Sequence, residues 1–158
     1  MWAELFQIDL EDENATNAFA RHLGTRVDRG DTLLLVGDIG AGKTHFARAL
    51  IQSLQEVPED VPSPTFTLIQ VYETSKCEIL HADLYRLSGP DETAELGLLE
   101  ALGRDVCLIE WPDRLGSDAP QNALTLSFTL TNGGESRRVQ GRGDPEYWAT
   151  RVHGVSDG

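Results

Sequence analysis

The sequence predicts one three-layer α/β domain over residues 1–158, with a mixed, mostly parallel central sheet and a C-terminal hairpin. Two continuous apolar runs, at 31–36 and 105–110, are typical of strands buried on both faces of a parallel sheet. Helical patterns interleave with strands in the first part of the chain. Near the end, Asn132-Gly133 separates two alternating segments, which indicates a β-hairpin.

The apolar spacing predicts the elements in order. Helical spacing from Ala15 to Leu23, followed by Gly24, predicts a helix that ends at this glycine. Strands are expected at 2–8, 31–36, 66–73, 78–83, 105–110, 123–131 and 136–141. Further helices are expected at 43–54, at 91–102 and from Pro145. Three prolines favour an extended connection after the second helix: Pro58, Pro62 and Pro64.

Composition limits the classes of function. A length of 158 residues suits one domain, since domains usually run to about 100–200 residues. The formal net charge of −13 disfavours broad binding to nucleic acid, because an acidic surface repels phosphate backbones. Two cysteines are too few for a disulfide framework. The sequence shows neither a signal peptide nor a membrane span, so we expect a cytoplasmic protein.

The segment at 37–44, GDIGAGKT, matches the phosphate-loop pattern G-x-x-x-x-G-K-[ST] at every fixed position. It follows a buried-type strand and opens a helix, as that motif requires. Its glycines allow a tight turn that aims backbone N–H groups inward, and the helix N-terminus favours negative charge. We therefore predict an ATP and Mg²⁺ site formed by Gly37, Asp38, Ile39, Gly40, Ala41, Gly42, Lys43, Thr44 and His45. The alternative is a plain glycine turn with a solvated Lys43.

Within this loop, Lys43 is expected to reach the β- and γ-phosphate oxygens, and the Thr44 hydroxyl to ligate Mg²⁺. A carboxylate is also needed near the metal, and two strands end in one, at Asp83 and at Glu110. Both lie where ligands bind in open α/β sheets. Either could instead be a helix cap or a surface carboxylate. Glu110 could ligate the metal, order its water shell or orient an attacking water.

Four segments together resemble the TsaE family, also called YjeE. They read GDIGAGKTHFARAL, SPTFTLIQVYE, HADLYRL and IEWPDRL, at 37–50, 63–73, 81–87 and 109–115. The resemblance implies a P-loop NTPase-like fold, ATP and Mg²⁺ as ligands, and slow ATP hydrolysis. It also implies a role in threonylcarbamoyladenosine modification of tRNA, in a complex with two partner proteins, TsaB and TsaD.

The resemblance also suggests residue roles. Thr65 looks like a switch residue near the γ-phosphate, and Trp111 matches the family tryptophan beside the site. The implied catalytic residues are Lys43, Asp83, Glu110 and Thr65, and the implied metal ligands are Thr44 and Glu110. The chain departs from the usual pattern at Ile39 and His45, neither of which puts ATP binding in doubt.

Other interpretations stay open at this point. A small-molecule kinase would need a mobile, arginine-rich lid, whereas residues 117–141 suggest strands and a hairpin. A nucleotide-binding adaptor without turnover is also compatible with the sequence. The chain contains no N-K-x-D segment of the kind that recognises guanine, which argues against GTP. Thr16 is a plausible neighbour of adenine. His81 is expected to face the core or a partner, and Arg86 and Arg114 could contact phosphates or a partner.

Overall fold

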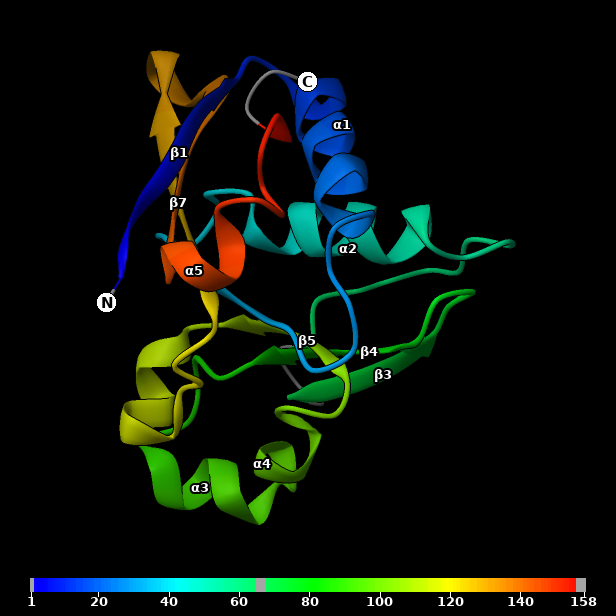
Figure 1. Ribbon diagram of the computed structural model, residues 1–158, viewed down its shortest axis with the longest axis vertical. Coiled ribbons are helices and arrows are strands. Elements are labelled where there is room, and N and C mark those ends of the chain that lie inside the picture. The colour runs from blue at the N-terminus through cyan, green and yellow to red at the C-terminus, as the bar shows by residue number, and fades with distance from the viewer. Residues whose placement is uncertain (1, 65–67, 156–158) are drawn as a thin grey trace.

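The computed structural model describes residues 2–64 and 68–155, and its centre is a single seven-stranded sheet (Figure 1). The strands are β1 (Ala3–Leu10), β2 (Thr32–Val36), β3 (Ile69–Glu73), β4 (Glu78–Asp83), β5 (Val106–Glu110), β6 (Leu124–Thr131) and β7 (Ser136–Gly143). Their spatial order is β1-β7-β6-β2-β5-β4-β3. The strand that precedes the phosphate-loop sequence, β2, therefore lies at the centre.

The sheet is mixed, as predicted. Strands β6, β2, β5 and β4 pair in parallel, in that order across the sheet. The remaining pairs, β1 with β7, β7 with β6 and β3 with β4, are antiparallel. Five of the seven strands consequently run in one direction. The predicted hairpin is formed by β6 and β7, with the turn at Asn132–Gly134.

Helices cover both faces of the sheet. They are α1 (Glu13–Gly24), α2 (Lys43–Ser53), α3 (Pro90–Glu95), α4 (Leu98–Ala101) and α5 (Pro145–Trp148), with a 3₁₀ segment, η1, at Pro112–Asp118. Figure 1 shows α1 and α2 on one side and α3 and α4 on the opposite side. Helix α1 starts where the Asp12 carboxylate accepts the Ala15 N–H at 2.9 Å, and it ends at Gly24 as predicted.

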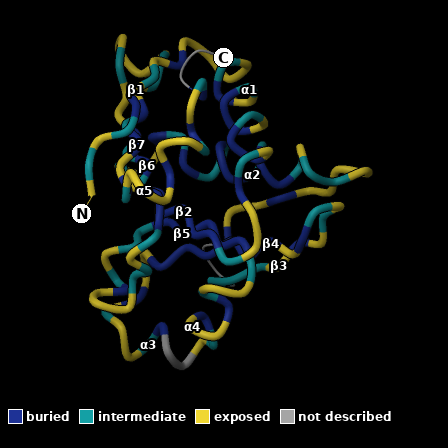
Figure 2. Tube along the Cα trace, viewed as in Figure 1, coloured by how far each residue is buried: buried dark blue, intermediate teal, exposed yellow. Residues whose placement is uncertain are grey.

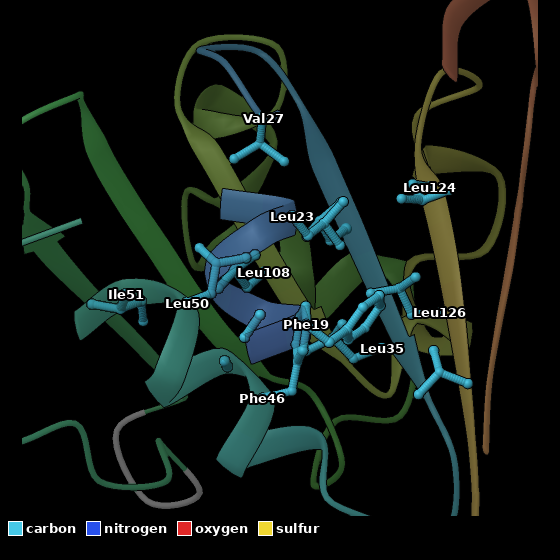
Figure 3. Packing of buried hydrophobic residues seen from close by; sticks show 14 of the residues in the cluster. Phe19, Leu23, Val27, Leu35, Phe46, Leu50, Ile51, Leu108, Leu124 and Leu126 are labelled. Carbon is cyan, nitrogen blue, oxygen red and sulfur yellow. The ribbon is translucent and has the colours of Figure 1, made fainter. Parts of the chain in front are cut away.

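Alternation along β2 separates two cores. Leu33 and Leu35 belong to one cluster with side chains of α1 and α2. Figure 3 shows Leu35 beside Phe19 of α1 and Phe46 of α2. The intervening residue Leu34 belongs to a second cluster on the opposite face, which includes residues of α4 and η1. The buried segments in Figure 2 follow the central strands and the inner sides of the helices. Because each buried leucine contributes about 1.5–3 kcal/mol, both layers hold β2 firmly in place.

Two expectations are wrong in detail. The helix expected at 91–102 is divided into α3 and α4, because Gly97 adopts a left-handed φ of 76° that a continuous helix does not accommodate. The segment after β5 forms η1 before β6 starts at Leu124, so strands do not begin near residue 117. Part of the strand expected at 66–73 lies outside the described residues. Within the described chain, no helix is long and apolar enough to cross a membrane.

Candidate functional site

The phosphate-loop sequence connects the end of β2 to the start of α2 at Lys43. Two glycines in it are required by geometry. Gly37 has a φ of 150°, and an added Cβ would lie 2.6 Å from the backbone oxygen of Phe128. Gly42 has a φ of 103°, directly before the helix. Only glycine reaches such backbone angles without strain, so the loop is bent back toward the helix N-terminus.

Lys43 is held inside the loop. Lys43 is only 4% exposed, and its Nζ donates to the Gly37 backbone oxygen at 2.6 Å. The same nitrogen lies 3.8 Å from the centre of the Trp111 ring, a cation–π contact. This burial contradicts the alternative in which Lys43 is solvated. Burial lowers the pKa of the ammonium, and nearby carboxylates, Glu110 first, oppose that shift.

Thr44, in the first turn of α2, points at the end of β5. Its Oγ1 donates to both carboxylate oxygens of Glu110 at 3.0 Å each. Glu110 is 3% exposed, and its Oε2 also lies 2.7 Å from Nε2 of His81 on β4. The hydroxyl and the carboxylate assigned to the metal from the sequence are therefore in direct contact.

Asp83 is placed beside Glu110 by the register of the sheet. The two residues are paired at the ends of β4 and β5, and Asp83 is 6% exposed. One Asp83 oxygen accepts the Tyr85 N–H at 3.0 Å. Both carboxylates are therefore buried at one edge, and the surface-carboxylate alternative is wrong.

The oxygens of Thr44, Glu110 and Asp83 form a donor set that suits Mg²⁺, which prefers oxygen ligands. Among the described residues, no group of three or more His, Cys, Asp and Glu side chains could hold a metal ion. A Mg²⁺ ion bound to a nucleotide needs only one or two protein carboxylates, because phosphates and waters complete its shell. The residues present fit such an ion.

A cavity of about 520 Å³ opens over this group. Its wall includes these residues: Ile39, Gly40, Gly42, Lys43, Thr44, His45, Arg48, Ser63, Asp83, Tyr85, Glu110, Trp111 and Arg137. Gly37 and Asp38 line a neighbouring cavity that shares Lys43 and Trp111. Ala41 is 1% exposed and packs in the core, so only its backbone is left to face a ligand. Thr65 lies outside the described residues.

Arg137 is a site residue that the sequence did not indicate. It comes from β7, and its Nε lies 3.1 Å from the position of an added Cβ on Gly42. It lines the main cavity and a second one of about 230 Å³, which also contains Thr16. Within the described ranges its hydrogen bonds go to the backbone oxygens of Gly134 and Ser136, and no carboxylate pairs with it. Only the pairing of distant strands reveals this position.

Three other residues have structural partners. The Arg114 Nε donates to the Leu87 oxygen at 2.7 Å, which ties η1 to the segment after β4. His45 shares a 2.9 Å hydrogen bond with Asn17 and so links α2 to α1. Trp111 has a left-handed φ of 58°, and its ring packs 4.8 Å from that of Tyr85.

Fold and site together define a phosphate-loop α/β domain with a P-loop NTPase-like architecture. The family model described as "Threonylcarbamoyl adenosine biosynthesis protein TsaE" matches residues 10–139. The chain belongs to the TsaE family, which confirms the resemblance inferred from the sequence.

Relatives named tRNA threonylcarbamoyladenosine biosynthesis protein TsaE agree with this assignment. The Rickettsia felis protein is 44% identical over 104 residues, which cover 66% of this chain and 61% of the relative, less than two thirds of its length. The Bacillus subtilis protein is 38% identical over 112 residues, or 70% of this chain and 69% of the relative. The crystal structure of Bacillus subtilis YdiB superposes with a TM-score of 0.79 at 25% identity, covering 99% and 97% of the two chains.

Proposed function

We propose that this chain is a Mg²⁺-dependent ATPase with slow turnover that acts in threonylcarbamoyladenosine biosynthesis on tRNA, in a complex with TsaB and TsaD. Family membership supports the pathway. The observation that supports the chemistry is the contact of Thr44 with Glu110 beside the buried Lys43, at a glycine loop that opens a helix.

The loop residues would bind the triphosphate. A phosphate oxygen would replace the Gly37 carbonyl as acceptor for Lys43 and gain a charge-assisted hydrogen bond. The N-terminus of α2 would add its partial positive charge. Thr44 and Glu110, with Asp83 beside them, would hold Mg²⁺, which neutralises charge on the β- and γ-phosphate oxygens.

Two carboxylates are available for hydrolysis. Glu110 would stay on the metal side with Thr44, and Asp83 would orient a water toward the γ-phosphate. We further propose that Thr65 senses the γ-phosphate, as ordered switch segments do. Ser63, two residues before Thr65 in the sequence, lines the main cavity.

The second cavity is where we place the nucleoside. It contains Thr16, the residue expected near adenine, and it shares Gly42, His45 and Arg137 with the main cavity. Arg137 would then lie at the junction, beside the phosphate nearest the ribose. Three acidic residues, Asp12, Glu13 and Glu135, also line this cavity, so it suits an uncharged base better than a phosphate.

Protein partners fit the charge of the surface. A formal charge of −13 makes direct tRNA binding by this chain unfavourable, so the tRNA would be held by another subunit. TsaB and TsaD are the partners we propose, with TsaD carrying the transferase chemistry.

Binding of a nonhydrolysable ATP analogue with Mg²⁺, compared between the unmutated chain and Lys43→Ala, tests the site. We expect clear binding to the first and a large loss in the second. Equal behaviour of the two chains, or no binding to either, would refute the proposal.

Phosphate release, measured alone and with TsaB and TsaD present, then tests turnover. No release under either condition would leave only a nucleotide-binding adaptor. A phosphorylated product that appears with an added small acceptor would favour the kinase alternative. At saturating Mg²⁺, Glu110→Gln is expected to retain nucleotide binding and to lose Mg²⁺-dependent hydrolysis.

A further inference from the structure

His81 lies on the same face of the sheet as the two carboxylates. Side chains alternate along a strand, so His81 and Asp83 project from β4 on one face. The register pairs His81 with Leu108 and Asp83 with Glu110. Glu110 is therefore the diagonal neighbour of His81, one step closer to the edge where the phosphate loop lies.

The contact between His81 and Glu110 fixes which imidazole nitrogen carries hydrogen. Nε2 of His81 lies 2.7 Å from Oε2 of Glu110, and both residues are almost fully buried, at 0% and 3% exposed. A carboxylate that holds a metal ion is ionised and only accepts hydrogen bonds, so in that role of Glu110 the donor is Nε2. The opposite nitrogen, Nδ1, has no hydrogen-bond partner among the described residues.

Such a histidine is costly as a packing residue. A buried polar group without a partner costs about 1–3 kcal/mol, and a leucine at this place would avoid that cost. Its neighbours on the strand, Ile79 and Leu80, are apolar and buried. Among the described residues, the only hydrogen bond of the His81 ring is therefore the one with Glu110.

We propose that His81 is a positioning residue for the metal-side carboxylate. Its Nε2–H holds Oε2 of Glu110 from one side while the Thr44 hydroxyl holds both oxygens from the other. A free glutamate side chain samples many rotamers, and these two donors restrict it before any ligand arrives. The carboxylate is thus preset in the orientation in which it meets a Mg²⁺–nucleotide complex.

This inference rests on the proposed function. It predicts different effects on the affinity for Mg²⁺ and on the affinity for the nucleotide in the absence of metal. Hydrogen-bonding partners behind a metal ligand typically contribute 10–100-fold to metal affinity. His81 does not line the main cavity, so it is not expected to touch the nucleotide itself. Removal of its donor is expected to weaken the affinity of the site for Mg²⁺ and to leave nucleotide binding without metal almost unchanged.

The experiment compares three substitutions, His81→Leu, His81→Asn and His81→Gln, by titrating a fluorescent ATP analogue at a series of Mg²⁺ concentrations and in EDTA. Leucine removes the donor, and asparagine places its amide near the Nδ1 position. Glutamine extends its amide to the Nε2 position and keeps the donor. Ile79→Val is the matched control, since it alters a buried side chain on the same face and strand away from the carboxylates.

We expect His81→Leu and His81→Asn to need roughly 10–100-fold more Mg²⁺ for half-maximal binding, with affinity in EDTA within about twofold of the unmutated chain. His81→Gln and Ile79→Val should stay close to the unmutated chain. Should His81→Leu fail to fold, the asparagine and glutamine pair decides, because both keep a polar amide of similar size.

A Mg²⁺ dependence that is unchanged in His81→Asn overturns the inference. An equal loss of affinity with and without metal also overturns it, because that pattern indicates a general structural role. In both cases Mg²⁺-dependent binding by the unmutated chain still supports the proposed function. If the unmutated chain shows no Mg²⁺-dependent binding, the proposed function itself fails.

Discussion

The Thr44 hydroxyl lies 3.0 Å from each carboxylate oxygen of Glu110, at the point where the phosphate loop becomes a helix. A hydroxyl has one proton and two lone pairs, so donation to Glu110 leaves its lone pairs free to face a cation. The two side chains are 66 residues apart in sequence and are brought together by the parallel pairing of β2 with β5.

Replacing Thr44 by valine keeps the shape and removes the hydroxyl. We expect Thr44→Val to need at least about tenfold more Mg²⁺ for ATP-analogue binding, since one oxygen donor and one charged hydrogen bond are lost together. Thr44→Ser keeps the hydroxyl and is the control. Equal Mg²⁺ titrations for the two variants would contradict a role for this oxygen.

Arg137 and Arg138 are adjacent on β7 and offer a matched pair. Arg138 forms an exposed ion pair with Asp9, whereas Arg137 reaches the phosphate loop. We expect Arg137→Met to weaken binding of the ATP analogue about tenfold or more, because hydrogen bonds to charged groups contribute about 1.5–3 kcal/mol. Arg138→Met should leave it unchanged in the same fluorescence titration. A similar loss in both variants would indicate a general charge effect.

Gly37 is expected to tolerate no side chain. Gly37→Ala should lower the free energy of unfolding by more than about 1 kcal/mol and impair nucleotide binding, because its Cβ would meet the Phe128 oxygen at 2.6 Å. Gly40→Ala carries the strain of a φ of 84° but meets nothing within 4 Å. Urea unfolding of the two variants separates backbone strain from collision, and equal destabilisation would count against the collision.

Asp31 anchors the C-terminal segment from the opposite end of β2. It is 1% exposed, and its carboxylate pairs with both terminal nitrogens of Arg151 and accepts the Asp28 N–H at 2.6 Å. Arg151→Met leaves this charge buried, so we expect the free energy of unfolding to fall by roughly 3 kcal/mol. Arg138→Met, which breaks an exposed pair with Asp9, should cause no measurable change in urea unfolding.

Burial raises the pKa of the Cys107 thiol to about 12, from an ordinary value of 9.0. Between these values the unfolded chain ionises and the folded chain does not. The contribution of the thiol to stability is therefore full below pH 9 and is lost as the pH rises toward about 12. We expect Cys107→Ala to show a shallower decline in unfolding free energy above pH 9 than the unmutated chain. Identical slopes would contradict the shifted pKa.

The central βα unit and its loop were predictable from sequence, because local patterns specify them. The apolar run 31–36, the glycines and the helix from Lys43 all have short-range signals. The two carboxylates were also found, since each ends a buried strand at Asp83 and Glu110.

The remaining contacts depend on long-range strand pairing, which no local pattern encodes. Arg137 reaches Gly42 only because β7 lies beside β6, and β6 beside β2. The bond between His81 and Glu110 depends on the register of β4 against β5. The break at Gly97 was missed because one glycine within a helical composition is compatible with a continuous helix.

The order of the strands places the walls of the main cavity on both sides of β2. Asp83 and Glu110 stand on β4 and β5, and Arg137 stands on β7, across the sheet from them. A molecule seated there would bridge the two halves of the sheet without any covalent link. At a concentration one hundred times its dissociation constant, such a molecule adds about 2.7 kcal/mol to stability. Amide hydrogen exchange would then slow in the β6–β7 hairpin as well as in the phosphate loop that binds the ligand.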